Sequence, residues 1–218
     1  MAAQASTLAD RVASLLPLAL LPAAPAMLFL GASCICPAGD CRPSAFDAAG
    51  MALAASGQTP LADAFFRAVT WAGSILVLGP LALVHAAFAW HRLRCRRAFF
   101  LPVALAGAAL MAHATKIAIA RERPDVPALI DMPADASFPS AHSLQASAFV
   151  MAWLLAPGRS VRRARAGEIA IGLLLVALVA WSRLHLQVHY PSDILFALAA
   201  GAIWVLTFRQ PSIWRLKT

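Results

Sequence analysis

The sequence predicts an all-α protein, an integral membrane bundle of six transmembrane helices with both termini in the cytoplasm. Composition is the first reason: 61% of the 218 residues are hydrophobic and only 13% are charged, whereas about a quarter of a soluble domain is charged. The second is a series of apolar runs whose lengths approach the roughly 20 residues that cross a bilayer as a helix. The third is the placement of basic residues between these runs. We expect a single domain over residues 1–218, with its motif-bearing core at about 98–208.

Six apolar runs are the predicted spans, with polar or helix-breaking residues between them. The first lacks the positive segment that begins a secretory signal peptide, because Asp10 stands beside Arg11, and we expect it to be retained rather than cleaved. A lipoprotein cleavage site before Cys34 is the alternative, although Gly31 stands where a larger aliphatic residue is usual. The runs lie at about 12–33, 70–90, 98–119, 141–157, 168–186 and 191–208.

Basic residues gather between the second and third runs, between the fourth and fifth, and in the C-terminal tail. If the spans alternate, these segments share one side with the N-terminus, and the positive-inside rule assigns that side to the cytoplasm. The net charge of +8 is then explained by topology, and no segment combines a basic face with the aromatics of a nucleic-acid site. The residues concerned are Arg11, Arg92, Arg94, Arg96, Arg97, Arg159, Arg162, Arg163, Arg165, Arg209, Arg215 and Lys217.

The longest outward connection, about residues 34–69, is expected to form an amphipathic cover whose aromatic residues lie near the membrane interface. Its cysteines would face an oxidising compartment, which permits a disulfide. Cys34 and Cys36 are too close to pair, so the alternatives are a bond from either of them to Cys41 or three free thiols. The aromatic residues are Phe65, Phe66 and Trp71.

Ionisable residues gather at the outward ends of spans three to six, where hydrocarbon would cost them several kcal/mol without a partner or water. They form three clusters: "KIAIARERP" at 116–124, "PSAH" at 139–142 and "SRLHLQVHYPSD" at 182–193. All three would face the same compartment, and such residues predict a functional site. The alternative is that they only cap the spans at the interface. The acids between the first two clusters are expected to be solvated loop charges, with a metal site as the alternative, and are Glu122, Asp125, Asp131 and Asp135.

The first two clusters have the character of an anion site. Lys116 and Arg123 are seven residues apart, two helical turns, so both cations would project from one face; snorkelling to lipid headgroups is the alternative. Pro139 suits the first position of a helix. The free N–H groups of that helix, beside Ser140 and His142, would then point into the outward pocket and favour an anion.

The third cluster supplies acid–base chemistry. Arg183 ends span five, and His189 stands four residues before Asp193, close enough for the carboxylate to hold one imidazole nitrogen and raise the basicity of the other. His185 and His189 could instead form a metal pair, but Leu186 takes the place of the glutamate that follows the first histidine in zinc proteases. We therefore expect no metal or other cofactor.

In order and spacing, the three clusters resemble the tripartite signature of the type-2 phosphatidic acid phosphatase family, membrane lipid phosphatases of the haloperoxidase-like acid phosphatase superfamily. One position departs from the pattern, because the second motif usually has glycine where this chain has Ala141. A methyl group is tolerated there at helical backbone angles, but at positive φ it would strain the backbone or crowd the phosphate. The matching residues are Lys116, Arg123 and Pro124; Pro139, Ser140 and His142; and Ser182, Arg183, His189 and Asp193.

The resemblance implies a role for each matching residue. His189 would be the nucleophile that takes up the phosphoryl group, oriented by Asp193, and His142 would protonate the leaving oxygen and later activate water. Lys116, Arg123, Ser140, the backbone N–H of Ala141 and Arg183 would hold the phosphate, with Ser182, Pro124 and Pro139 in supporting positions.

The function that the resemblance implies is metal-independent hydrolysis of a lipid phosphate or diphosphate at the outer face of the cytoplasmic membrane. Polyprenyl diphosphates such as undecaprenyl diphosphate, phosphatidylglycerophosphate, phosphatidate and lipid A phosphate are the candidate substrates. The compact loops and alanine- and arginine-rich composition favour a bacterium, whose periplasm the site would face. The bilayer and the substrate lipid are the expected partners, with no nucleic acid. A lipid phosphotransferase, or a non-catalytic lipid binder or transporter, is the alternative, the latter suggested only by Ala141.

Overall fold

This computed structural model describes residues 22–94, 96–156 and 165–209, and within them it is helical, with no strand. Short 3₁₀ helices, η1 (Pro37–Gly39), η2 (Thr70–Gly73) and η3 (Arg96–Phe99), join the longer elements. The α-helices are α2 (Ala23–Ile35), α3 (Ala45–Ser56), α4 (Pro60–Val69), α5 (Ile75–Leu93), α6 (Phe100–Ile119), α7 (Ala141–Leu155), α8 (Arg165–His185) and α9 (Pro191–Phe208).

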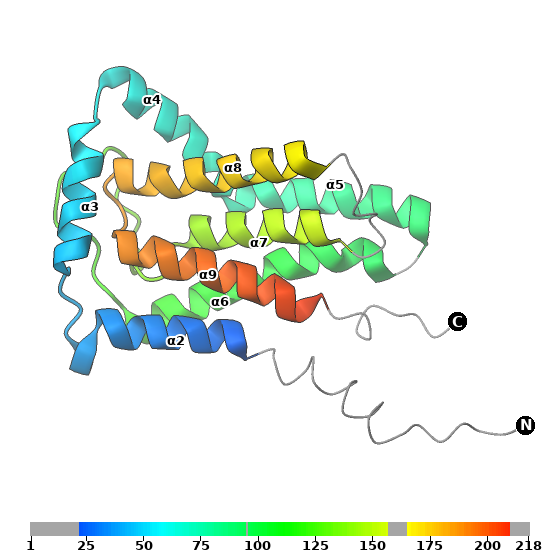
Figure 1. Cartoon of the computed structure of the whole chain (residues 1–218), viewed down its shortest axis with the longest axis horizontal. Helices are drawn as coiled ribbons and strands as arrows, with labels where there is room; N and C mark the ends of the chain where they lie inside the picture. Colours follow the sequence, from blue (N-terminus) through cyan, green and yellow to red (C-terminus); the bar gives the residue numbers. More distant parts are fainter. Residues whose placement is uncertain (1–21, 95, 157–164, 210–218) are drawn as a thin grey trace, which may run out of the picture.

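The long helices form a bundle around α7, and α3 crosses one end of that bundle (Figure 1). Helix α7 packs against α6, α8 and α9. Small side chains allow this close approach: a Cβ atom added at Gly201 of α9 would lie 2.7 Å from the carbonyl oxygen of Leu144 in α7. Buried alanines such as Ala108, Ala148 and Ala197 line the same contacts, as expected for helices that associate within a bilayer.

The described part of each predicted apolar run overlaps a helix, although the helices differ in length. The segments Ile75–Arg92, Arg96–Ile119, Ala166–His185 and Pro191–Phe208 are long and apolar enough to cross a membrane. Helices α2 and α7, with 13 and 15 residues, are shorter. The protein is therefore membrane-embedded and all-helical in its described part, and the count of six spans stays a prediction.

Several predictions concern residues outside the described ranges. They are the first half of the first run, the position of both termini and the basic residues Arg11, Arg159, Arg162, Arg163, Arg215 and Lys217.

The connections gather at two opposite ends of the bundle. The turn from α5 to α6, which carries Arg94, Arg96 and Arg97, lies at one end (Figure 1). Helix α3, the connection from α6 to α7 and the turn from α8 to α9 lie at the other. The three polar clusters therefore share the α3 end.

The outward connection forms two helices. Ser44 caps α3 in a capping box with Asp47, and Thr59 with Pro60 begins α4, as their preferences predict. A disulfide joins Cys36 to Cys41 just before α3, and Cys34 is free and exposed. One of the two predicted pairings is thus confirmed.

Candidate active site

The turn from α8 to α9 places His189 and Asp193 beside each other. Asp193 is the third residue of α9, and its Oδ2 accepts a hydrogen bond from the backbone N–H of Tyr190 at 2.9 Å. Gln187 takes a left-handed conformation, with φ 60°, and its side-chain amide donates to the carbonyl oxygen of Leu184 at 2.9 Å. This tight turn brings His189 back over the start of α9.

Polar contacts at both ring nitrogens orient the imidazole of His189. Its Nδ1 lies 3.6 Å from Oδ2 of Asp193 and 3.4 Å from Oγ of Ser137. The Ser137 hydroxyl donates to Oδ2 of Asp193 at 2.5 Å, so toward His189 it can only accept. The network thus assigns the proton to Nδ1 and leaves a lone pair on Nε2, which lies 3.3 Å from Nη1 of Arg123.

The environment of His189 keeps its imidazole neutral. Burial lowers the pKa of His189 well below its usual range, and the charges of Arg183, Arg123, Lys116 and His142 lower it further. A neutral imidazole with its free nitrogen turned toward cations is arranged to attack an electrophile that those cations hold.

Two of the predicted cations, Lys116 and Arg123, meet at one carboxylate. Oxygen atoms of Asp135 lie 3.2 Å from Nζ of Lys116 and 2.5 Å from Nη2 of Arg123. The Lys116 ammonium also donates to the carbonyl oxygen of Ala136, and Nη1 of Arg123 donates to that of Val188 at 2.6 Å. The predicted convergence of Lys116 and Arg123 beside His189 is therefore present.

Asp135 departs from its prediction as a solvated loop charge. Although its side chain is 53% exposed, it bridges two cations. Burial would raise the pKa of Asp135, but its hydrogen bond to Arg123 and the charges of Lys116 and Arg123 lower it below the usual range. It lies where a bound anion would contact the same cations.

Arg183 and His142 belong to the same group of interacting charges. Arg183 is buried, and its Nη1 donates to Oγ1 of Thr70 at 2.7 Å, while its Nε has no hydrogen-bond partner in the described part of the chain. Its charge acts on both His142 and His189. Gly73 lets η2 approach closely, since a Cβ there would lie 3.0 Å from the carbonyl oxygen of His142.

The start of α7 differs from its prediction. Helix α7 begins at Ala141, with Ser140 as its N-cap in an extended conformation, so Pro139 precedes the cap and is not the first helical residue. The Phe138–Pro139 peptide bond is cis. Ser140 is also tied to the protein: its N–H donates to the carbonyl oxygen of Asp193 at 3.3 Å, and its hydroxyl lies 3.0 Å from that of Ser143.

A comparison with known families gave a match to the part of the sequence that carries all three clusters. The sequence model of the PAP2 superfamily matches residues 97–215, more than half of the chain. The chain belongs to the PAP2 superfamily.

Individual relatives support the assignment. Decaprenylphosphoryl-5-phosphoribose phosphatases of two Mycobacterium tuberculosis strains, CDC 1551 / Oshkosh and ATCC 25618 / H37Rv, are each 38% identical to this chain over 106 residues. The alignment covers 45% of this chain and 54% of those proteins, so the chain spans about half the length of the curated relatives that it matches.

Two solved structures share the fold. The first transmembrane PAP2-type phosphatidylglycerolphosphate phosphatase from Bacillus subtilis superimposes with a TM-score of 0.72 at 21% identity, over 88% of this chain and 93% of that one. Aquifex aeolicus LpxE gives a TM-score of 0.61 at 23% identity, over 76% of this chain and 95% of that one. These similarities concern the fold alone.

The departure from the PAP2 pattern at Ala141 is structurally mild. Ala141 is the first residue of α7 and is not among the residues with positive φ, so its methyl group does not strain the backbone. The side chain packs against the hydrophobic core. Backbone strain thus gives no reason to expect a binder without turnover.

The remaining PAP2 motif positions have supporting contacts. The Ser182 hydroxyl donates to the carbonyl oxygen of Val179 at 2.6 Å, within its own helix. Pro124 is buried next to Arg123. The described residues contain no group of three or more His, Cys, Asp or Glu side chains that could hold a metal ion.

Three residues of the cluster were not predicted: Ser137, Asp47 and Arg121. Ser137 lies two residues before the "PSAH" segment, and Arg121 lies inside "KIAIARERP". Arg121 could have been identified from its place at the end of a predicted span, because a cation at that depth in the membrane needs an acidic partner. Nothing in the local sequence identifies Asp47, which precedes Arg121 by 74 residues, as that acid.

Proposed function

We propose that this chain is a membrane lipid phosphatase that transfers the phosphoryl group of a lipid phosphate or diphosphate to His189 and then to water. The orientation of His189 is the observation that carries the proposal. Its protonated Nδ1 is held by Ser137 and Asp193, and its free Nε2 faces Arg123. This arrangement fits nucleophilic attack on phosphorus without a metal ion.

In the first step, Nε2 of His189 attacks phosphorus, and an N–P bond forms as the bond to the leaving oxygen breaks. His142, as general acid, donates its proton to that oxygen. Lys116, Arg123 and Arg183 offset the charge that spreads over the three equatorial oxygens, and the backbone N–H of Ala141 at the start of α7 adds a donor.

In the second step, water attacks the phosphohistidine. His142 takes the proton of that water, the N–P bond breaks, and inorganic phosphate leaves with the bonding pair of electrons returned to Nε2. Asp193 stabilises the imidazole throughout by keeping the proton on Nδ1.

Asp135 would have to give up its place to the substrate. Its carboxylate bridges Lys116 and Arg123, the cations that are proposed to hold the phosphate. Because Asp135 is half exposed, its side chain can turn to water when a phosphate with greater charge takes over both contacts. The bridge keeps the two cations in place until then.

We propose that the site faces the outer side of the cytoplasmic membrane. The α5–α6 turn with its arginines lies at the opposite end of the bundle (Figure 1), and basic turns favour the cytoplasm. The disulfide between Cys36 and Cys41 lies at the site's end, which fits an oxidising compartment.

Polyprenyl-linked phosphates are the first substrates to test, because the curated relatives are named for a decaprenyl-linked phosphoribose. The panel is farnesyl diphosphate, decaprenylphosphoryl-5-phosphoribose, dioctanoyl phosphatidate and dioctanoyl phosphatidylglycerophosphate. The full-length chain, purified in dodecyl maltoside with EDTA, should release phosphate from at least one of them.

The decisive variant is His189→Ala. With a substrate that carries ³²P in its phosphoryl group, it should show neither release of phosphate nor an acid-labile label on the protein. His113→Ala is the matched control, since His113 is exposed on α6, and it should keep both. Turnover by His189→Ala at the wild-type rate would eliminate the proposed nucleophile. Transfer of label to a lipid or sugar acceptor in preference to water would make the chain a phosphotransferase.

A further inference from the structure

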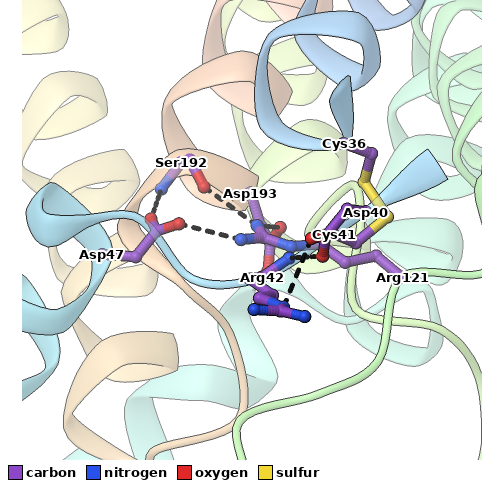
Figure 2. The surroundings of a disulfide bond; sticks show 8 residues. All are labelled: Cys36, Asp40, Cys41, Arg42, Asp47, Arg121, Ser192 and Asp193. Atoms are coloured by element: carbon purple, nitrogen blue, oxygen red, sulfur yellow. Dashed lines mark hydrogen bonds and ion pairs between the residues drawn. A yellow bond between two sulfur atoms is a disulfide. The ribbon is translucent and has the colours of Figure 1, made fainter. Parts of the chain in front are cut away.

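Arg121 is the largest fully buried side chain among the described residues, at 1% exposed. Its guanidinium lies between two carboxylates that are both 0% exposed. Nη1 donates to Oδ1 of Asp193 at 2.5 Å, and Nη2 donates to Oδ2 of Asp47 at 2.8 Å. Figure 2 shows this chain of charges beneath the disulfide. It joins α3, the α6–α7 connection and α9.

Further contacts surround Asp47 and Arg121. Oδ1 of Asp47 accepts the backbone N–H of Ser192 at 3.0 Å, and Nη1 of Arg121 also donates to the Ser192 hydroxyl at 2.9 Å. The guanidinium stacks over the ring of Tyr190, 4.2 Å from its centre. Burial would lower the pKa of Arg121, but the carboxylates of Asp193 and Asp47 raise it, so the group stays charged.

The two oxygens of Asp193 serve different partners. Oδ1 bonds to Arg121, whereas Oδ2 bonds to Ser137 and Tyr190 and lies 3.6 Å from Nδ1 of His189. A carboxylate rotates readily about its last bond unless both oxygens are held. The contact of Arg121 with Oδ1, together with those of Ser137 and Tyr190 with Oδ2, therefore fixes which oxygen faces His189.

We propose that Asp47 and Arg121 are positioning residues for the nucleophile. Arg121 fixes the rotation of the Asp193 carboxylate, Asp47 holds the far side of Arg121, and the fixed Asp193 keeps Nε2 of His189 aimed at phosphorus. This role rests on the proposed function of His189. Asp47 lies before residues 97–215, which match the PAP2 model, so the outward helix α3 contributes to the site that the motifs outline.

The role of Asp47 also explains where α3 sits. Asp47 is the N3 residue of α3 and shares a capping box with Ser44, so the helix start and the charge chain use the same carboxylate. Gln187 of the catalytic turn donates to the carbonyl oxygen of Met51 one turn later at 3.3 Å. Helix α3 therefore lies against the nucleophile's turn at two points.

The first test is Asp47→Asn, which keeps the shape of the side chain and removes its charge. With farnesyl diphosphate as the probe, kcat should fall on the order of tenfold to a hundredfold, since small misplacements of a reacting group cost that much, and KM should change less than twofold. The matched control is Asp63→Asn in α4, which removes a charge that contacts His185 and should keep the wild-type kcat. A wild-type kcat for Asp47→Asn would overturn the proposal.

A double-mutant cycle separates positioning from general loss of stability. If Asp47 acts through Asp193, Asp47→Asn should cost no further activity in an Asp193→Asn background. Independent, multiplicative losses would show that Asp47 only stabilises the fold and would overturn the role.

Arg121→Lys covers the case in which Asp47→Asn does not fold. Lysine keeps the charge, but one ammonium cannot reach both carboxylates as the guanidinium fork does, so kcat should fall with little change in KM. Full kcat in Arg121→Lys contradicts the proposal. If His189→Ala is inactive while these variants are fully active, the positioning role is rejected and the proposed phosphatase function is kept. If His189→Ala is active, the proposed phosphatase function itself is rejected.

Discussion

Helices α3 and α4 cover the same end of the bundle (Figure 1), yet they are attached to it differently. Helix α3 sends Asp47 into a fully buried chain of charges that ends on Asp193. Helix α4 sends Asp63 to Nε2 of His185 at 2.8 Å, where Phe66 also packs against the imidazole. No residue of α4, all of which the structure describes, is fully buried.

The difference indicates that two helices that cover the same site can have separate roles. The α3 attachment passes through groups that touch the proposed nucleophile, so its loss should change catalysis as well as stability. The α4 attachment ends four residues before His189, at His185, and Leu61 and Phe65 of the same helix are exposed. Loss of the α4 attachment should affect stability or lipid contact and leave the catalytic rate unchanged.

Removing the guanidinium of the α3 attachment should have the largest effect. Arg121→Met leaves Asp47 and Asp193 buried without their cation, which costs about 3–5 kcal/mol of folding free energy. Thermal unfolding in dodecyl maltoside should show a strongly lowered midpoint or no folded protein. Arg67→Met is the control, because this α4 arginine is exposed and donates to the carbonyl oxygen of Leu129 rather than to a buried carboxylate. Equal midpoints for both variants would contradict the asymmetry.

The disulfide before α3 should have the next largest effect. Its loop is short, with a sequence separation of 5, so the loss of the bond in Cys36→Ser/Cys41→Ser should cost about 2 kcal/mol through loop entropy. The unfolding midpoint should fall, while kcat should fall less than in Asp47→Asn because Asp47 still holds α3. Cys34→Ser, at the free exposed cysteine, should match the wild type. A kcat loss as large as that of Asp47→Asn would make the disulfide part of the positioning chain.

Much of this arrangement could be predicted from local sequence. Apolar runs predicted helices because a bilayer-length segment must satisfy its backbone internally, and Pro191 begins α9 as its preference for the first turn indicates. The motif spacing predicted that Lys116, Arg123 and His189 would converge. In the structure Lys116 and Arg123 share the carboxylate of Asp135, and Arg123 contacts His189.

What could not be predicted depends on contacts distant in sequence or on backbone detail. Arg121 reaches acids 72 and 74 residues away, and several acids in the outward connections could have served. The start of α7 was misplaced because Pro139 is as compatible with the residue before an N-cap as with the first turn. The backbone angles of Ala141, on which the effect of its methyl group depended, follow from that same start.

The α4 attachment should produce a smaller effect, confined to stability. His185→Leu removes the partner of Asp63, whose side chain is 19% exposed and can rehydrate, so the cost should be near the low end for a lost buried hydrogen bond, about 1 kcal/mol. Unfolding in detergent should register this shift, and kcat with farnesyl diphosphate should stay within about twofold of wild type. A tenfold loss of kcat would place α4 beside α3 as part of the site and remove the distinction between them.

The effect that should be smallest at neutral pH, and grow only on acidification, is a pH dependence on the α3 side. Burial and the charges of Arg183, Arg123 and Lys116 lower the pKa of His189. Below about pH 6.5 this imidazole is therefore protonated in the unfolded chain but stays neutral in the folded chain. The contribution of His189 to the free energy of unfolding should therefore be fully present above that pH. Below it, the free energy of unfolding should fall by up to about 1.4 kcal/mol per pH unit. Asp135, with its lowered pKa, loses its contribution only below about pH 4. His189→Gln should reduce the loss between pH 7.5 and 5.5 that the wild type shows in unfolding experiments. An identical loss in both proteins would assign the dependence to other groups and contradict the neutral, enclosed imidazole on which the attack at phosphorus depends.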